Sequence, residues 1–125
     1  MSTSDFERWL EAHHAEEGAF TALVVLVSIG ETSVTPLAST FLNVIGPDAT
    51  WAELVTMFAG AGQDWDGAAF FPRQDADGDP LDNETARAVL RELEGRLAAD
   101  RLVLNDGHFF DKWGRQLQIE EMTRQ

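Results

Sequence analysis

The hydrophobic pattern at the start of the chain is that of an amphipathic helix. Apolar side chains between Phe6 and His13 recur at i, i+3, i+4 and i+7, which places them on one helix face. Ser4 and Glu7 have the spacing of a capping box, in which each side chain accepts from the backbone amide of the other residue. We therefore expect a helix that ends near Glu17–Gly18.

The next run, Thr21–Ile29, is almost entirely apolar and rich in β-branched residues. This composition is typical of a strand buried on both faces, although a helix stays open because so short a run shows no diagnostic period. Gly67–Phe71 predicts another short strand. A three-stranded meander is predicted for the tail, with turns at Asn105–Gly107 and Trp113–Gly114 and strands at Arg101–Leu104, His108–Asp111 and Arg115–Glu120.

Three more helices follow from capping signals joined to apolar stripes. Thr35–Pro36 predicts one that continues to Gly46, with the stripe Leu37, Phe41, Val44 and Ile45. Thr50 and Glu53 open another, and the clearest helix begins at Asp79–Pro80 or at Asp82. The sequence thus predicts a single α+β domain over residues 1–125, with about four helices and a short, mainly antiparallel sheet that ends in the C-terminal three-stranded meander.

The composition fits a globular chain with its own core. Hydrophobic residues make up 44% of the 125 residues and charged residues 25%, whereas disordered segments are poorer in apolar residues. The chain contains no cysteine, which excludes disulfides and thiolate metal sites. The N-terminus lacks the basic start and apolar run of a signal peptide, so we expect a cytoplasmic protein.

The strongest compositional feature is a formal net charge of −13, from 22 acidic and 9 basic residues. Residues 1–72 contain Arg8 as their only lysine or arginine. Binding to phosphates needs clustered cations, so we expect neither direct nucleic-acid binding nor association with an anionic membrane. The charge permits three roles, namely solubility alone, attraction to a basic protein partner or binding of a hard cation, and the charge-poor stretch 18–47 leaves a homo-oligomer open.

The densest acidic motif contains Asp75, Asp77 and Asp79. Over five residues it resembles the opening of an EF-hand calcium loop, and this resemblance implies Ca²⁺ or Mg²⁺ as the ligand. The motif departs from that family at the sixth and twelfth positions, where Pro80 and Ala86 replace glycine and glutamate. A solvated loop whose last carboxylates cap the following helix is the alternative, because capping explains Asp79, Asp82 and Glu84 without a metal, and we expect no other cofactor.

Two weaker candidates for chemistry remain. Asp64 and Asp66 precede a strand and could share a metal or act as an acid–base pair, and a metal-dependent hydrolase would add His108 to them. In a turn, however, such carboxylates more often bond their own backbone. His13 and His14 lie about one helical turn from Glu17, but one helix supplies too few ligands for a metal, and no nucleophile motif accompanies His108.

Tryptophans in turns are candidates for protein contact. Trp65 and Trp113 both lie in predicted turns, and large aromatic residues are enriched at the centres of interfaces. Together with Asp64 and Asp66 they form the predicted interface. The sequence therefore favours a non-enzymatic interaction module of the inhibitor, immunity or adaptor type that engages a basic partner. The alternative is a metal-binding protein or metal-dependent hydrolase that uses the acidic 64–84 segment.

Overall fold

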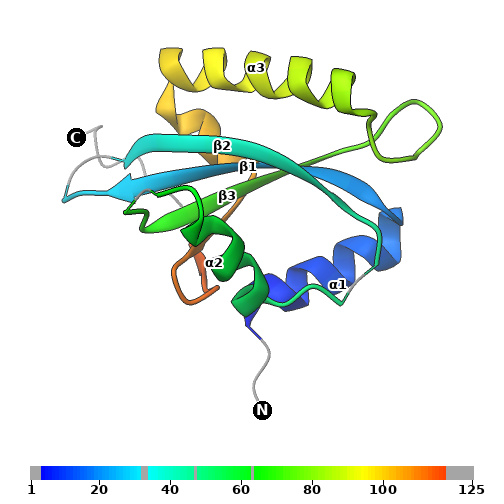
Figure 1. Ribbon diagram of the computed structural model, residues 1–125, viewed down its shortest axis with the longest axis horizontal. Helices are drawn as coiled ribbons and strands as arrows, with labels where there is room; N and C mark the ends of the chain where they lie inside the picture. The colour runs from blue at the N-terminus through cyan, green and yellow to red at the C-terminus, as the bar shows by residue number, and fades with distance from the viewer. Residues whose placement is uncertain (1–3, 32–33, 47, 63, 118–125) are drawn as a thin grey trace.

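A central antiparallel sheet organises the protein, whose computed structural model describes residues 4–31, 34–46, 48–62 and 64–117. Its strand order is β2-β1-β3-β4-β5, so β1 lies inside the sheet and β2 forms one margin (Figure 1). The strands are β1 (Phe20–Ile29), β2 (Val34–Val44), β3 (Gly67–Arg73), β4 (His108–Asp111) and β5 (Gln116–Leu117).

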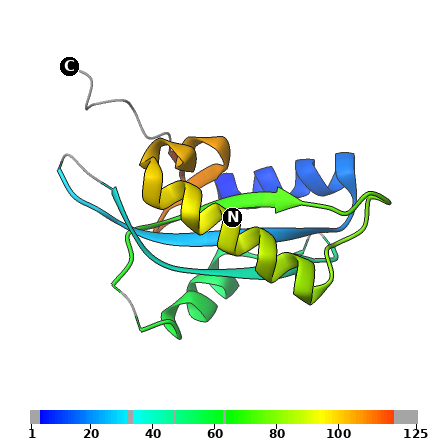
Figure 2. The same ribbon diagram turned by 90° about the horizontal axis from the view of Figure 1, so that it is seen from above.

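Helices cover both faces of this sheet (Figures 1 and 2). The helices α1 (Asp5–Glu17) and α2 (Trp51–Ala59) pack on one face. The helix α3 (Asn83–Ala99) and the 3-10 helix η1 (Arg101–Asp106) pack on the other. The α+β class predicted from the sequence is therefore confirmed, with three α-helices instead of about four among the described residues.

Strand β1 is apolar throughout because it supplies both cores. Successive side chains of a strand point to opposite faces. Accordingly, Val24 and Leu26 pack with the α1/α2 side, whereas Leu23 and Val25 pack with the α3 side. The alternative of a helix over Thr21–Ile29 is thereby removed, and the predicted buried strand is confirmed.

The predicted capping residues begin the helices as expected. Ser4 and Glu7 form a complete capping box on α1, and Thr50 and Glu53 form one on α2. Of the two starts considered for α3, the structure has Asp82 as the N-cap, and its carboxylate accepts from the amide of Thr85 at 2.8 Å. Local sequence signals therefore mark all three helix starts correctly.

The helix predicted from Thr35 to Gly46 is wrong, because the structure has β2 there instead. β2 pairs along its length with β1, and the register shifts at Leu37. This bulge interrupts the alternation, so Leu37 and Leu42 pack with the α1/α2 core while Phe41 packs with the α3 core. With Leu37 as the extra residue, the apolar positions of β2 have a spacing that resembles the stripe of a helix. The segment is nevertheless a strand, because it pairs with β1.

The predicted meander is corrected at its first strand. Residues 101–106 form η1, whose Asp100 cap accepts from the amide of Leu102 at 3.0 Å, and Leu104 is fully buried. The turn expected at Asn105–Gly107 is therefore the end of η1. β4 is confirmed, and β5 covers Gln116–Leu117, whereas residues 118–120 of the last predicted run lie outside the described residues.

Within the part of the chain that the structure describes, no helix combines the length and apolarity needed to cross a bilayer.

Candidate functional site: an acidic loop and two exposed turns

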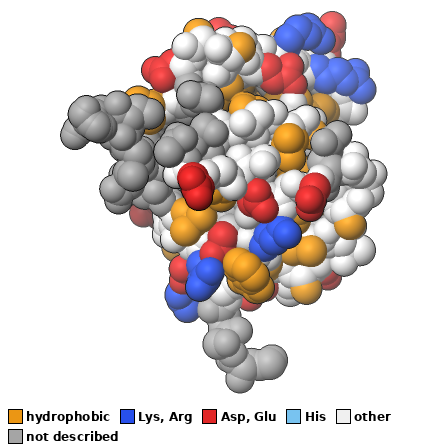
Figure 3. Space-filling view, turned by 90° about the vertical axis from the view of Figure 1, so that its left-hand side faces the viewer, with side chains coloured by type: hydrophobic (Ala, Val, Ile, Leu, Met, Phe, Trp, Pro, Cys, Tyr) orange, Lys and Arg blue, Asp and Glu red, His pale blue; other side chains and the backbone are white. Residues whose placement is uncertain are grey.

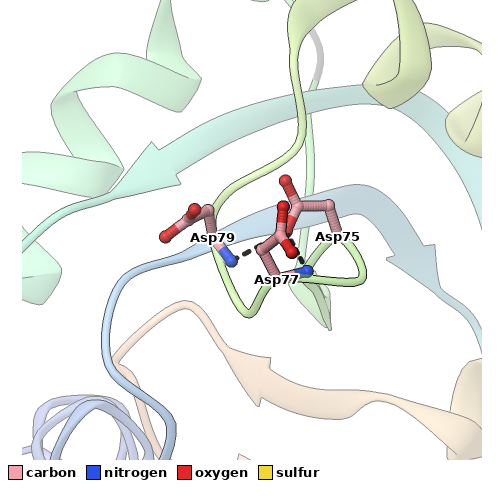
Figure 4. A group of neighbouring side chains, drawn as sticks. All are labelled: Asp75, Asp77 and Asp79. Carbon is pink, nitrogen blue, oxygen red and sulfur yellow. Dashed lines mark hydrogen bonds between the residues drawn. The ribbon is translucent and has the colours of Figure 1, made fainter.

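The loop between β3 and α3 gathers the three carboxylates of the densest acidic motif (Figure 4). One carboxylate oxygen of Asp75 accepts from the amides of Asp77 and Asp79, each at 2.9 Å. The carbonyl of Asp79 in turn accepts from the amide of Asp75 at 2.8 Å. Asp75 thus folds the loop onto itself, and the three side chains stay exposed on one small turn.

Gln74 fastens this loop to the end of α1. Its side-chain amide donates to the carbonyls of Glu17 and Ala19, both at 2.8 Å. The exposed carboxylate of Glu17 therefore belongs to the same end of the molecule as the acidic loop, although the two are far apart in sequence. We call this region, defined by Glu17, Asp75, Asp77 and Asp79, the acidic end.

The acidic end has the ligand type but not the full ligand number of a calcium site. One ligand oxygen from each of Asp75, Asp77 and Asp79 lies within 4.8 Å of the others. Calcium takes six to eight oxygen ligands. The remaining ligands would have to be backbone carbonyls or water. Among the described residues, no second group of three such side chains is brought together, so Asp64, Asp66 and His108 do not form one.

Asp64 and Asp66 differ in their roles. Asp66 joins the start of β3 to the end of β1, because its carboxylate accepts from the amide of Ile29 and its own amide donates to the carbonyl of Val27, both at 2.7 Å. Asp64 is exposed. Asp66 therefore bonds backbone, as turn carboxylates commonly do, and Asp64 is left as the surface charge of the pair.

The two tryptophans of the predicted interface occupy opposite environments. Trp65 is 7% exposed and packs edge-on against Phe58 with ring centroids 5.5 Å apart. Trp113 is 68% exposed, with the guanidinium of Arg115 5.1 Å from its ring centroid. Only Trp113 therefore offers its ring to solvent.

The turn that presents Trp113 is built around a buried carboxylate. Asp111 is 6% exposed and accepts from the amides of Trp113 and Arg115 and from the Arg115 side chain at 2.7 Å. Gly114 closes the turn at φ +80°, which favours glycine. Figure 3 shows basic, acidic and hydrophobic side chains interleaved on the side of the molecule that faces left in Figure 1.

Two of the three histidines, His13 and His108, belong to an aromatic cluster between α1 and the sheet. The Trp9 ring lies 4.8 Å from His108 and 5.5 Å from His13, and His13 lies 4.6 Å from Phe20, all between centroids. Burial lowers the pKa of His108 below its usual value, and the nearby His13 lowers it further. His14 instead donates to the carbonyl of Ile45 at 2.9 Å.

Two residues that organise these regions were missed in the sequence. Gln74 has no pattern of its own, because its role depends on the distant end of α1. Asp111 had a local signal, an aspartate three residues before a glycine in a turn, which is typical of a carboxylate that bonds the turn's amides. Comparison with known proteins finds no matching family model, no matching curated protein and no matching solved structure.

Proposed function

We propose that this protein is a non-enzymatic interaction module of the inhibitor, immunity or adaptor type, which engages a basic protein through its acidic surface. The observation that carries the proposal is the acidic end. There, Glu17 of α1 and the three aspartates of the loop are exposed together, without an ion pair to any described residue. The ion pairs of the described residues lie elsewhere, at Arg8–Asp5, Arg96–Asp106 and Arg115–Asp111.

Unpaired carboxylates raise the local negative potential, which steers a cationic partner and discriminates against acidic ones. Because none of the four forms an ion pair with a described residue, a basic partner gains their attraction without first breaking a native ion pair. An anionic ligand such as a nucleic acid or a phospholipid surface is disfavoured by the same potential. The chain's net charge of −13 extends this preference beyond the acidic end.

The test is salt-dependent capture of protein partners on the immobilised protein, compared with the triple variant Asp75→Asn/Asp77→Asn/Asp79→Asn. Asparagine keeps the side-chain oxygen that accepts in the turn, so this variant removes charge but retains the loop. The matched control removes the same charge elsewhere, in Glu11→Gln/Glu53→Gln/Glu92→Gln, all at exposed positions. We expect basic proteins to be captured at low ionic strength, released by salt and lost in the first variant only.

Equal capture by both variants would show that the interface does not include the acidic end. If nothing that salt releases is captured at all, the electrostatic interaction proposal fails. The second candidate, a cation site, is favoured by the mutual distance of 4.8 Å or less among the three carboxylates. Calorimetry with Ca²⁺, Mg²⁺ and Zn²⁺ tests it, because heat that disappears in Asp75→Asn/Asp77→Asn would support a metal and a flat titration would contradict it.

A further inference from the structure

The margin of the sheet at β2 has an unusual composition for an exposed edge strand. Natural proteins blunt such edges with charged residues, proline or bulges. β2 has Pro36 and the bulge at Leu37, but both lie near its beginning. The remaining segment, Ala38–Val44, pairs with β1 in continuous register and contains no charge, proline or glycine. Among the described strands it has no neighbour on its outer side.

A groove opens beside this edge, between β2 and α3. Its volume is about 410 Å³, within the ~300–1,000 Å³ range of pockets that hold ligands. Apolar groups from three elements line it, among them Val25 of β1, Pro36 of β2 and Leu97 of α3. The groove therefore offers an apolar surface next to backbone groups that can pair with another strand.

The groove has one charged side chain in its wall, and that side chain is acidic. Glu94 of α3 is exposed and accepts a hydrogen bond from the hydroxyl of Ser39 on β2. No lysine or arginine lines the groove, although Arg87 and Arg91 lie farther towards the start of α3. A largely apolar groove with a carboxylate in its wall complements a lysine or arginine, whose methylene stem packs on apolar surface while its head pairs with the acid.

We propose that the basic partner docks here as an extended segment, which adds as a strand to Ala38–Val44 and places a lysine or arginine in the groove against Glu94. The inference rests on the proposed function, since it names the chemistry and the docking mode of the basic partner. Strand addition takes its affinity from backbone hydrogen bonds and its specificity from side-chain pockets beside the edge. β2 supplies the first and the groove supplies the second.

The occupant is a basic strand and not a second copy, on grounds of charge. A second copy carries the same net charge of −13, and pairing edge to edge would bring two such bodies together. Glu31 and Asp48, which flank β2 in sequence, are both exposed and would add to the repulsion. The same carboxylates attract a basic segment.

The probe is a display library of random peptides, selected on the full chain, followed by a synthetic copy of a selected basic peptide. We expect this peptide to protect the backbone amides of Ala38–Val44 from hydrogen exchange. An N-methylated copy, which keeps the charge but loses backbone donors, should bind at least tenfold more weakly. Glu94→Gln should weaken binding roughly tenfold, between the values for an exposed ion pair and a charge-assisted hydrogen bond, whereas Glu92→Gln on the same helix should not.

A second pair of variants separates the edge from the groove. Thr40 is exposed on β2, so Thr40→Lys places a repelling cation on the edge, whereas Ala88→Lys adds the same charge on the outside of α3. We expect only Thr40→Lys to abolish binding. Basic peptides that bind in a salt-sensitive way but ignore Thr40→Lys and N-methylation would overturn this inference and leave the proposed function standing. A library that yields no basic peptide would overturn this inference, whereas the proposed function fails only when protein capture finds nothing that salt releases.

Light scattering on the free protein tests whether a second copy of the chain occupies the β2 edge. A monomer is expected. A dimer that Thr40→Lys dissociates and Ala88→Lys does not would show that a second copy takes the edge, and it would overturn the docking of a basic segment.

Discussion

The two faces of the sheet are filled with different kinds of side chain. On the α1/α2 face, rings contact rings, and Phe70 of β3 has aromatic neighbours from both helices, including Phe6 at 5.0 Å and Trp51 at 6.2 Å. On the α3 face, the core is mainly aliphatic and is covered by one α-helix and η1. Large flat rings close the first face, whereas the single helix on the second leaves the groove beside β2.

This difference separates stability from accessibility. Aromatic pairs contribute about 0.5–1.5 kcal/mol each beyond their buried area, so the face with many of them gains additional cohesion. The face with a narrow helical cover retains a place where another chain can dock. We therefore expect the aromatic face to contribute more to the stability of the fold and the α3 face to provide the docking surface.

Phe70 and Phe71 provide the largest test of this comparison. They are neighbours on β3, each 1% exposed, and they point to opposite faces. Truncation to alanine should lower the free energy of unfolding by about 3–5 kcal/mol at either position. The leucine variants discriminate, because Phe70→Leu also loses ring contacts. Urea unfolding should show Phe70→Leu to be less stable than Phe71→Leu by about 1 kcal/mol, and equal losses would contradict the comparison.

The sequence anticipated the aromatic face better than the α3 face. Both helices of the first face have capping boxes and apolar stripes, which are local signals and were read correctly. On the other side of the comparison, the groove depends on β2 and α3. β2 was predicted as a helix, because its bulge at Leu37 disguised the alternation and its pairing with β1 is non-local. The groove could not be predicted without that strand.

The candidate sites divide along the same line. The turn of Asp75, Asp77 and Asp79 is local, and its acidic composition identified it in the sequence. Its position beside Glu17 is non-local and depends on Gln74, which has no sequence signal. Predicting proximity between distant segments requires the register of β1 and β3, which hydrophobic patterns do not specify.

Gly107 sharpens the comparison by showing that the α3 face is tightly packed away from the groove. A Cβ at this position would lie 2.7 Å from the Phe70 carbonyl oxygen and 2.9 Å from the ring of Phe71. Gly107→Ala should therefore lower the free energy of unfolding by roughly 1–3 kcal/mol, as overpacking does. Urea unfolding measures this loss. An unchanged free energy of unfolding would mean that the α3 face is packed as loosely at Gly107 as it is beside β2.

The aromatic face should also be the one that is sensitive to acid. Burial and the nearby His13 hold the pKa of His108 below that of the unfolded chain, so the unfolded state binds more protons in the interval between the two values. The contribution is therefore complete above the unfolded pKa of about 6.5 and is lost as the pH falls through the folded pKa. His108 faces Trp9 and His13, and no carboxylate contributes to the shift of its pKa.

The measurement is the free energy of unfolding of the wild type minus that of His108→Gln, followed between pH 7.5 and 5. The subtraction cancels the carboxylates that titrate in both proteins. We expect the difference to fall with decreasing pH. His14→Gln serves as the control, because His14 bonds the carbonyl of Ile45 outside the Trp9 cluster. A difference that does not depend on pH would show that protonation leaves the aromatic face undisturbed.

The smallest expected effect is a gain, and it concerns the one α-helix on the α3 face. Gly95 lies inside α3, and a Cβ there would meet nothing within 4 Å. Glycine in a helix interior costs about 0.5–1 kcal/mol relative to alanine, so Gly95→Ala should raise the free energy of unfolding by that amount. Gly78→Ala is the contrasting variant, because Gly78 has φ +83° and a side chain there is strained despite the open space. Hydrogen exchange shows where the added stability lies. If the stability of α3 limits that of its face, the α3 amides become better protected in Gly95→Ala. An equal gain in protection over α1 and α2 would mean that the two faces open only together.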